Sequence, residues 1–265
     1  MPEQHPHQRQ TGNKRPGAAL ITGGGRRIGR AICEKLARSG HDIGVHFHNS
    51  REEAAELAKI LAGYGVRAEI FGADLADPAA CQRLIGESSD AFGALPLLVN
   101  NAAIFEPDTL ASLDLKGFER HMAVNLRAPV LLAQAFAKAL PQDTDGAIIN
   151  IIDQRVLRLN PTCFSYTLSK SALWTATRTL AQALAPRIRV NAIGPGPSLA
   201  NVLEGDAGLN REAALVPLQH IVSPQQIAEA VLYLAGAHSV TGQMIAVDSG
   251  QHLSWRTPDV VANLP

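Results

Sequence analysis

The stretch Ala18-Ala19-Leu20-Ile21-Thr22-Gly23-Gly24-Gly25-Arg26-Arg27-Ile28-Gly29 decides the fold of this chain. A short apolar run, typical of a strand, leads into a glycine cluster, and a helical pattern follows over residues 28–39. Glycines let the backbone turn tightly and approach a pyrophosphate without a Cβ in the way. The helix N-terminus adds unpaired amides and partial positive charge. The stretch therefore predicts a dinucleotide-binding strand, turn and helix.

Short apolar runs and helical patterns alternate along the rest of the chain. Strands are expected at Ala18–Thr22, Ile43–Phe47, Arg67–Phe71, Leu97–Asn100, Ala147–Ile152, Arg187–Ile193 and Met244–Val247. Helical patterns cover Ile28–Ser39, Arg51–Gly63, Ala79–Phe92, Leu115–Leu140, Phe164–Leu184 and Pro224–Leu234. Such alternation, joined by right-handed crossovers, predicts an α/β fold with a single doubly wound (Rossmann-type) parallel sheet and helices on both faces.

The 265-residue length and the lack of a Pro/Ser-rich linker favour one domain over residues 17–265. Residues 1–16 are polar and lack the apolar core of a signal peptide, which predicts a disordered N-terminal tail. The weakly patterned segment 195–222 follows the end of a predicted strand, where ligands bind in such sheets. It is interpreted as a substrate loop or lid, the alternative being a merely mobile insertion.

The composition of the chain bears on its partners and its compartment. Lys plus Arg and Asp plus Glu both number 24, so the zero net charge does not favour nucleic acid or an anionic membrane. No apolar run approaches the ~20 residues needed to span a bilayer. Three widely spaced cysteines indicate reduced thiols in a cytoplasmic protein. No metal site is predicted.

Asp153, Tyr166 and Lys170 form the candidate catalytic group. Tyr166 and Lys170 are four residues apart, so they lie on one face of the predicted helix. An ammonium beside a phenol favours the phenolate, which predicts that the pKa of Tyr166 falls from ~10 toward neutrality. A tyrosine tuned in this way passes a proton near pH 7. Asp153 ends the preceding strand and is expected to face the same point.

The end of the second strand points to the kind of cofactor. It carries no Asp or Glu for a ribose 2′-hydroxyl. Its donors suit a 2′-phosphate, which favours NADPH/NADP over NAD; they are His46, His48, Asn49, Ser50 and Arg51. The alternative is that the two histidines simply fill the rim of the sheet. Arg27 adds a cation near the phosphates.

Further candidate cofactor residues follow other strands. Asp74 and Leu75 come after the third strand and are expected to contact adenine, and the small residues around Asn101 and Ala102 leave room for a ribose. Asn125 interrupts an apolar helix pattern in which asparagine is a poor helix former. It indicates a bound water or a local kink, or else an exposed side chain.

Together these motifs resemble the short-chain dehydrogenase/reductase family over nearly the whole chain. The matching pieces are Thr22–Gly29, Asp74, Asn100–Ala103, Asn125, Tyr166–Lys170 and Pro195-Gly196. The resemblance implies a homotetramer and hydride transfer from a nicotinamide. It also implies Tyr166 as proton donor, Lys170 on the nicotinamide ribose and Asn125 holding a water. The implied cofactor contacts include Gly23, Arg27, Ile28, Gly29, Tyr166, Lys170, Pro195 and Gly196.

One residue departs from the family pattern and points to one branch of the family. The family has a serine where this chain has Asp153, and an ionised aspartate cannot donate a hydrogen bond to a carbonyl. Aspartate there, the Arg-Ile-Gly ending of the glycine turn and Phe105 after Asn-Asn-Ala-Ala are similar to the pteridine reductase and dihydromonapterin reductase branch. That branch implies NADPH-dependent reduction of a pterin C=N bond, in dihydromonapterin, dihydrobiopterin or dihydrofolate. The implied substrate residues are Arg27, Phe105, Asp153, Tyr166 and Ser198.

Two other hypotheses remain open. In one, the protein is a short-chain reductase of another carbonyl or imine, and Asp153 is incidental. In the other, it is a non-catalytic NADP-binding protein, against which the presence of Asn125, Tyr166 and Lys170 argues.

Overall fold

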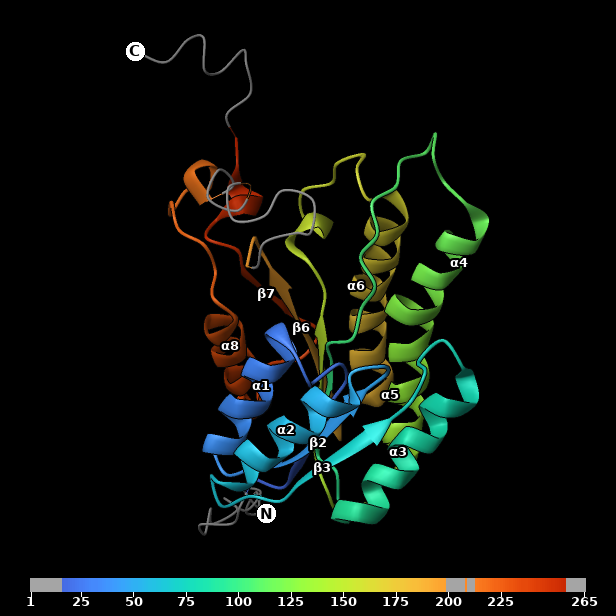
Figure 1. The fold of residues 1–265 in the computed structure, drawn as a ribbon, viewed down its shortest axis with the longest axis vertical. Helices are drawn as coiled ribbons and strands as arrows, with labels where there is room; N and C mark the ends of the chain where they lie inside the picture. Colours follow the sequence, from blue (N-terminus) through green and yellow to red (C-terminus); the bar gives the residue numbers. More distant parts are fainter. Residues whose placement is uncertain (1–15, 199–207, 209–212, 256–265) are drawn as a thin grey trace, which may run out of the picture.

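A computed structural model of the chain describes residues 16–198, 208 and 213–255. It shows a seven-stranded parallel sheet in the order β3-β2-β1-β4-β5-β6-β7, with helices on both faces (Figure 1). The predicted Rossmann-type architecture is confirmed. The strands are β1 (Ala18–Ile21), β2 (Asp42–Phe47), β3 (Ala68–Gly72), β4 (Leu97–Asn100), β5 (Gly146–Ile151), β6 (Ile188–Pro195) and β7 (Met244–Val247).

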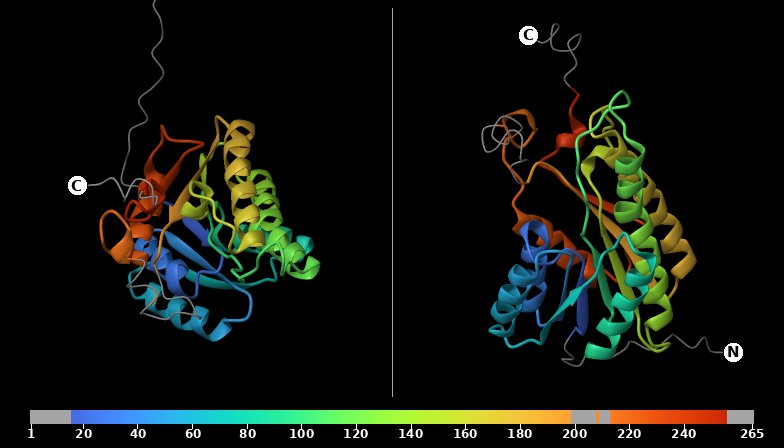
Figure 2. Two further views of the ribbon diagram at one scale, coloured as in Figure 1. Left: turned by 90° about the horizontal axis from the view of Figure 1, so that it is seen from above. Right: turned by 45° about the vertical axis from the view of Figure 1, so that its right-hand side comes forward.

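The helices form two layers, which Figures 1 and 2 show on either side of the sheet. One layer holds α1 (Arg27–Arg38), α2 (Arg51–Ala62) and α8 (Pro224–Gly236). The other holds α3 (Pro78–Phe92), α4 (Leu115–Met122), α5 (Ala128–Ala139) and α6 (Phe164–Leu184). Several begin at residues that satisfy their first amides. Asp77 caps α3, and Ser223 forms a capping box with Gln226 at the start of α8.

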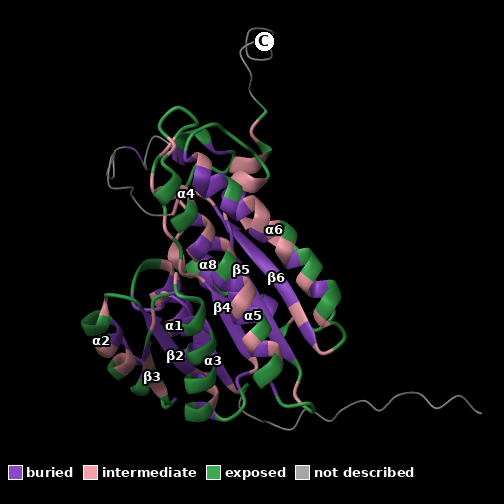
Figure 3. Cartoon of the chain, turned by 90° about the vertical axis from the view of Figure 1, so that its right-hand side faces the viewer, coloured by how far each residue is buried: buried purple, intermediate pink, exposed green. Residues whose placement is uncertain are grey.

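The central strands are buried on both faces, as Figure 3 shows for β4, β5 and β6. Residues paired in register point to the same side of the sheet. Leu20 of β1 lies opposite Leu98 of β4, and both pack in the core under α3 and α5. Ile21 and Val99, also paired, pack in the core under α1 and α8. Parallel pairing brings the carboxyl ends of all strands to one edge, where the candidate site residues follow them.

The predicted helix over residues 115–140 is not continuous. Between α4 and α5 lies a π-helical turn, η1 (Ala123–Arg127), in which Ala128 N–H donates to the carbonyl of Ala123. Asn125 sits inside this turn with no exposed surface. The expected local distortion is therefore confirmed, and an exposed Asn125 is ruled out.

Two expectations concern segments that the structure describes only in part. The disordered tail at residues 1–16 lies outside the described residues except for Pro16. Most of the expected substrate loop, at residues 199–207 and 209–212, also lies outside them. Within the described ranges, no helix is long and apolar enough to cross a membrane.

Candidate active site

The glycine turn between β1 and α1 has no room for side chains at its two ends. Gly23 adopts a φ of +62°, and a Cβ on Gly29 would lie 2.2 Å from the carbonyl oxygen of Gly23. Asn101 fastens the turn to β4, since its Nδ2 donates to the carbonyls of Thr22 and Gly23 at 2.9 and 3.1 Å. The turn is thus a bare, rigid backbone surface at the N-terminus of a helix, which suits a pyrophosphate.

Arg27 occupies a backbone conformation that favours glycine. Its φ is +51°, in the left-handed region, where a residue with a Cβ is disfavoured by ~1–2 kcal/mol. The chain keeps an exposed arginine there despite that cost. Such strain is found disproportionately at functional sites, so the position fits the predicted cation near the phosphates.

The buried ring of His46 supports the glycine turn from the protein interior. Gly23 N–H donates to its Nδ1 at 3.0 Å, so the proton lies on Nε2, which donates to the carbonyl of Ala73 at 3.1 Å. Burial lowers the pKa of His46 to about 4. Both ring nitrogens are used inside the protein, so the expectation that this side chain contacts the cofactor is corrected to a supporting role.

The other predicted cofactor residues divide into exposed and buried groups. His48, Asn49 and Arg51 are exposed around the half-buried Ser50, where β2 meets α2. Leu75 packs its side chain into the core under α3 and α5, which leaves only its backbone for adenine. Asp74 accepts a hydrogen bond from Ala76 N–H at 2.9 Å. Ala102 is half-buried beside the glycine turn.

Asp153, Tyr166 and Lys170 come together in the structure, as their spacing predicts. Tyr166 OH donates to Asp153 Oδ2 at 3.0 Å, and Asp153 Oδ1 accepts from Arg155 N–H at 2.8 Å. Lys170 Nζ lies 5.7 Å from the centre of the Tyr166 ring and donates to the carbonyl of Ile151 at 2.8 Å. A short 3-10 turn, η2 (Gln154–Val156), holds Asp153 at its start.

The predicted fall in the pKa of Tyr166 is wrong for this state of the protein. Burial, followed by the adjacent Asp153 carboxylate, raises the pKa of Tyr166 well above 10. Burial also lowers the pKa of Lys170 to about 8 and raises that of Asp153. Near neutral pH the phenol is therefore protonated, and it is the pKa values of its partners Asp153 and Lys170 that move toward neutrality.

Asn125 acts on the segment that follows β4. Its Oδ1 accepts from Ile104 N–H at 2.9 Å, and its Nδ2 donates to the Ile104 carbonyl at 3.0 Å and to Ser169 Oγ at 3.1 Å. Both of its amide hydrogens are thus used within the protein, which gives this side chain a positioning role, and the water implied for Asn125 stays a prediction.

Phe105 comes directly after this clamp. Its side chain is 48% exposed, and its ring centre lies 4.7 Å from that of Tyr166, nearly edge-on at 87°. The guanidinium carbon of Arg155 lies 5.9 Å from the centre of the Phe105 ring. Sequence reasoning missed Arg155, although a cation two residues after Asp153 in the same loop was a usable signal.

The remaining predicted residues lie at the same edge of the sheet or near it. Pro195 pairs with Val247, and a Cβ on Gly196 would lie 2.5 Å from the Cα of Asp248. Ser198 and Ile28 are half-buried. Among the described residues, no hydrogen bond or ion pair joins Arg27 or Ser198 to Asp153 or Tyr166.

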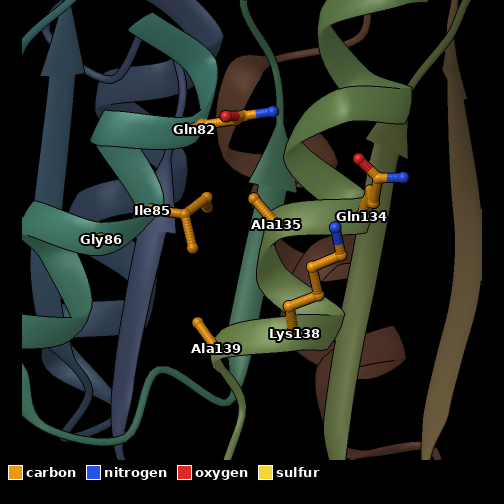
Figure 4. Close-up of a pocket in the computed structure, with 7 residues that line it drawn as sticks. All are labelled: Gln82, Ile85, Gly86, Gln134, Ala135, Lys138 and Ala139. Carbon is orange, nitrogen blue, oxygen red and sulfur yellow. The ribbon is translucent and has the colours of Figure 1, made fainter. Parts of the chain in front are cut away.

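A hollow between α3 and α5 does not belong to this site. Figure 4 shows its lining residues, which include Gln82, Ile85 and Lys138 and none of the predicted site residues. Within the described ranges, no group of three or more His, Cys, Asp or Glu side chains could hold a metal ion.

Comparison with known proteins gives the family of this chain. Residues 23–252 match a family model described as enoyl-(acyl carrier protein) reductase. A short-chain type dehydrogenase/reductase from Picea abies is 31% identical over 88% of this chain and 91% of its own length. The chain belongs to the short-chain dehydrogenase/reductase family. It is an oxidoreductase of that family.

Two further proteins of named activity are similar to this short-chain dehydrogenase/reductase. The 3-oxoacyl-[acyl-carrier-protein] reductase FabG of Staphylococcus aureus (strain Mu50 / ATCC 700699) is 30% identical, covering 89% of this chain and 98% of that protein. The crystal structure of FolM alternative dihydrofolate reductase 1 from Brucella canis, complexed with NADP, is 48% identical. It covers 92% of this chain and 97% of that one, with a TM-score of 0.87.

Proposed function

We propose that the protein is an NADPH-dependent pterin reductase that reduces a C=N bond of a dihydropterin, such as dihydromonapterin or dihydrobiopterin. Dihydrofolate is a further candidate substrate. The observation that carries the proposal is the 3.0 Å hydrogen bond between Tyr166 and Asp153, beside the half-exposed ring of Phe105. The 48% identity to the Brucella canis FolM structure supports the same class of substrate.

The residues present fit the cofactor. The side-chain-free backbone at Gly23 and Gly29 would hold the pyrophosphate, with Arg27 beside it. The polar rim formed by His48, Asn49, Ser50 and Arg51 would take the 2′-phosphate. Bound NADPH supplies the hydride. The family resemblance implies that Lys170 would bind the nicotinamide ribose.

Tyr166 and Asp153 together handle the proton that the substrate nitrogen must gain. The phenol is protonated near neutral pH and donates from a fixed position, while the carboxyl of Asp153 returns a proton to it. This route needs a protonated Asp153, and burial raises the pKa of that group. Reduction is therefore expected to slow as the pH rises through the pKa of Asp153.

Phe105 is suited to hold a flat heteroaromatic ring. Offset stacking on an aromatic side chain contributes ~0.5–1.5 kcal/mol beyond the buried area. The ring is exposed, and it is positioned by the clamp between Asn125 and Ile104. A small ketone would gain little from such a surface, so Phe105 favours a pterin over a simple carbonyl substrate.

We also propose a cytoplasmic homotetramer. The family resemblance implies the assembly, and the three buried, unpaired cysteines are consistent with a reducing compartment.

The test is NADPH oxidation by the purified protein with dihydromonapterin, dihydrobiopterin, dihydrofolate and simple ketones. Tyr166→Phe removes the donating hydroxyl and is expected to lower kcat on pterins by roughly 10²–10⁴-fold. Asp153→Ser is expected to lower it as well. Tyr64→Phe is the matched control, because that hydroxyl lies after α2 and accepts a hydrogen bond from the exposed Arg38 at the end of α1. Its kcat should equal that of the wild type.

One other activity has an observation in its favour. The 30% identity to FabG fits a reductase of another carbonyl or imine substrate. Ketone turnover that survives or rises in Asp153→Ser, with pterins inert, would decide for that alternative. NADPH binding without turnover of any substrate would instead indicate a non-catalytic protein.

A further inference from the structure

The segment that carries Phe105 is tied down on both sides of that residue. This segment, residues 101–114, is called the Phe105 loop below. One residue before Phe105, the backbone of Ile104 is bonded to Asn125 of η1. Three residues after Phe105, Asp108 reaches the start of α6. Phe105 therefore sits on a short span between two fixed points.

The second tie compensates for a missing cap. The residue that precedes α6 is Cys163, which has a φ of +52° and makes no side-chain capping bond. Asp108 takes over this role from outside the helix. Its carboxylate accepts from Ser165 N–H at 3.1 Å to each oxygen, and from Ser165 Oγ at 2.5 Å. Its own carbonyl accepts from Phe164 N–H at 3.3 Å.

The hydrogen bonds that Asp108 accepts are strengthened by its negative charge and by its place at the N-terminus of α6. A carboxylate at a helix N-terminus is favoured by the helix dipole, and charge-assisted hydrogen bonds are about twice as strong as neutral ones. Ser165 is fully buried, so its hydroxyl depends on a protein partner. The next residue in α6 is Tyr166, and the centre of its ring lies 4.7 Å from the centre of the Phe105 ring. Asp108 thus joins the two segments that present these rings.

We propose that Asp108 is a positioning residue that fixes the stacking ring of Phe105 relative to the proton donor Tyr166. The inference rests on the proposed function, in which Phe105 stacks on the substrate. It assigns substrate alignment to a residue that acts through Phe105 and the start of α6. The Phe105 loop and the start of α6 are expected to behave as one unit.

A double-mutant cycle tests the proposal. Asp108→Ala is expected to raise KM for a dihydropterin about tenfold, since small misplacements at a site have large kinetic effects. Phe105→Ala raises KM by a similar factor. If Asp108 acts through Phe105, adding Asp108→Ala to Phe105→Ala raises KM by less than about twofold further. Equal effects of Asp108→Ala in both backgrounds, or no effect in either, would overturn the proposal.

Two controls separate positioning from general damage. Asp108→Asn retains one acceptor oxygen and should recover most of the wild-type KM. The Kd for NADPH should be unchanged in all variants, because among the described residues the hydrogen bonds of Asp108 run to Phe164 and Ser165 and none runs to the glycine turn. A tenfold weaker Kd for NADPH in Asp108→Ala would indicate a global defect and count against the proposal.

Hydrogen exchange gives a readout that needs no substrate. In Asp108→Ala, amide exchange is expected to accelerate by about tenfold both at residues 104–109 and at residues 164–166. Acceleration at residues 164–166 alone would mean that Asp108 is only a helix cap, and would overturn the proposal. If the wild type reduces no pterin, the proposed function fails, while the exchange experiment still decides whether Asp108 joins the two segments.

Discussion

At the scale of single residues, Lys170 is retained at a cost to stability. It is 2% exposed, and burial lowers its pKa from 10.5 to about 8. Each pKa unit corresponds to ~1.4 kcal/mol, so holding the charge inside the fold costs on the order of 3 kcal/mol below pH 8. Active sites are places where such costs are expected.

Lys170→Met is therefore predicted to be inactive and yet more stable than the wild type at pH 7. The gain is at most ~3 kcal/mol, reduced by roughly 1 kcal/mol for the lost bond to Ile151. Between pH 8 and 10.5 the folded wild type loses the Lys170 proton before the unfolded chain does, so wild-type stability rises with pH there. Urea unfolding at pH 7 and pH 10 measures this. A variant that is less stable than the wild type at pH 7 would contradict it.

Some properties of these residues could be predicted from the sequence and others could not, because only some of them depend on local geometry. The spacing of Tyr166 and Lys170 follows from helix geometry, so their shared face was predictable. The rise in the pKa of Tyr166 was not, because it depends on burial and on the contact with Asp153. Asp108 was missed because its partner Ser165 lies 57 residues away in sequence, and no local pattern encodes that contact.

At the scale of elements, β2 and the glycine turn are joined by the neutral ring of His46. Burial lowers its pKa from 6.5 to about 4, so the unfolded chain binds a proton in this interval and the folded protein does not. Stability from this group is therefore complete above pH 6.5 and is lost as the pH falls toward 4.

His46→Gln is predicted to flatten the loss of stability between pH 6.5 and 4 by up to ~3 kcal/mol, and to weaken NADPH binding several-fold by loosening the turn. His41→Gln is the matched control. His41 is also buried with a lowered pKa, but it lies in the loop between α1 and β2 and bonds to the carbonyl of Leu36 in α1. It should alter the pH dependence of unfolding and leave the Kd for NADPH unchanged. Equal Kd values in both variants would contradict the supporting role of His46.

Most element boundaries were predictable, because apolar periodicity and turn residues are local signals. The bounds of α6, β4 and β7 agree with the sequence prediction to the residue. The predicted helix over residues 115–140 failed at η1, where a tertiary clamp between Asn125 and Ile104 coincides with a break in the regular helix pattern. Periodicity marked the place through the polar Asn125 but could not specify a π turn.

At the scale of the whole molecule, the outer surface of α5 and α6 is the region we expect between subunits. A groove on this surface is lined mainly by small and aliphatic side chains, which include Ala133 and Ala137 of α5 and Leu180 and Leu184 of α6. Sedimentation velocity at micromolar concentration is predicted to give four times the mass of one chain. Leu180→Arg should lower that mass, because it introduces a charge on this surface. A monomer mass for the wild type would contradict the tetramer.

The π turn η1 has a consequence for how this chain tolerates changes in length. A bond from Ala128 to Ala123 spans one residue more than a regular helical turn, so the turn contains one extra residue. Removing one residue from 123–127 would restore a regular helix and leave α4 and α5 in phase, because the π turn is what absorbs the extra residue. Leu132 and Phe136 would then stay in the core, while the bonds of Asn125 to Ile104 would be disturbed. A single deletion here is therefore expected to leave the core packed, whereas a deletion inside α5 would rotate the rest of that helix by about 100°.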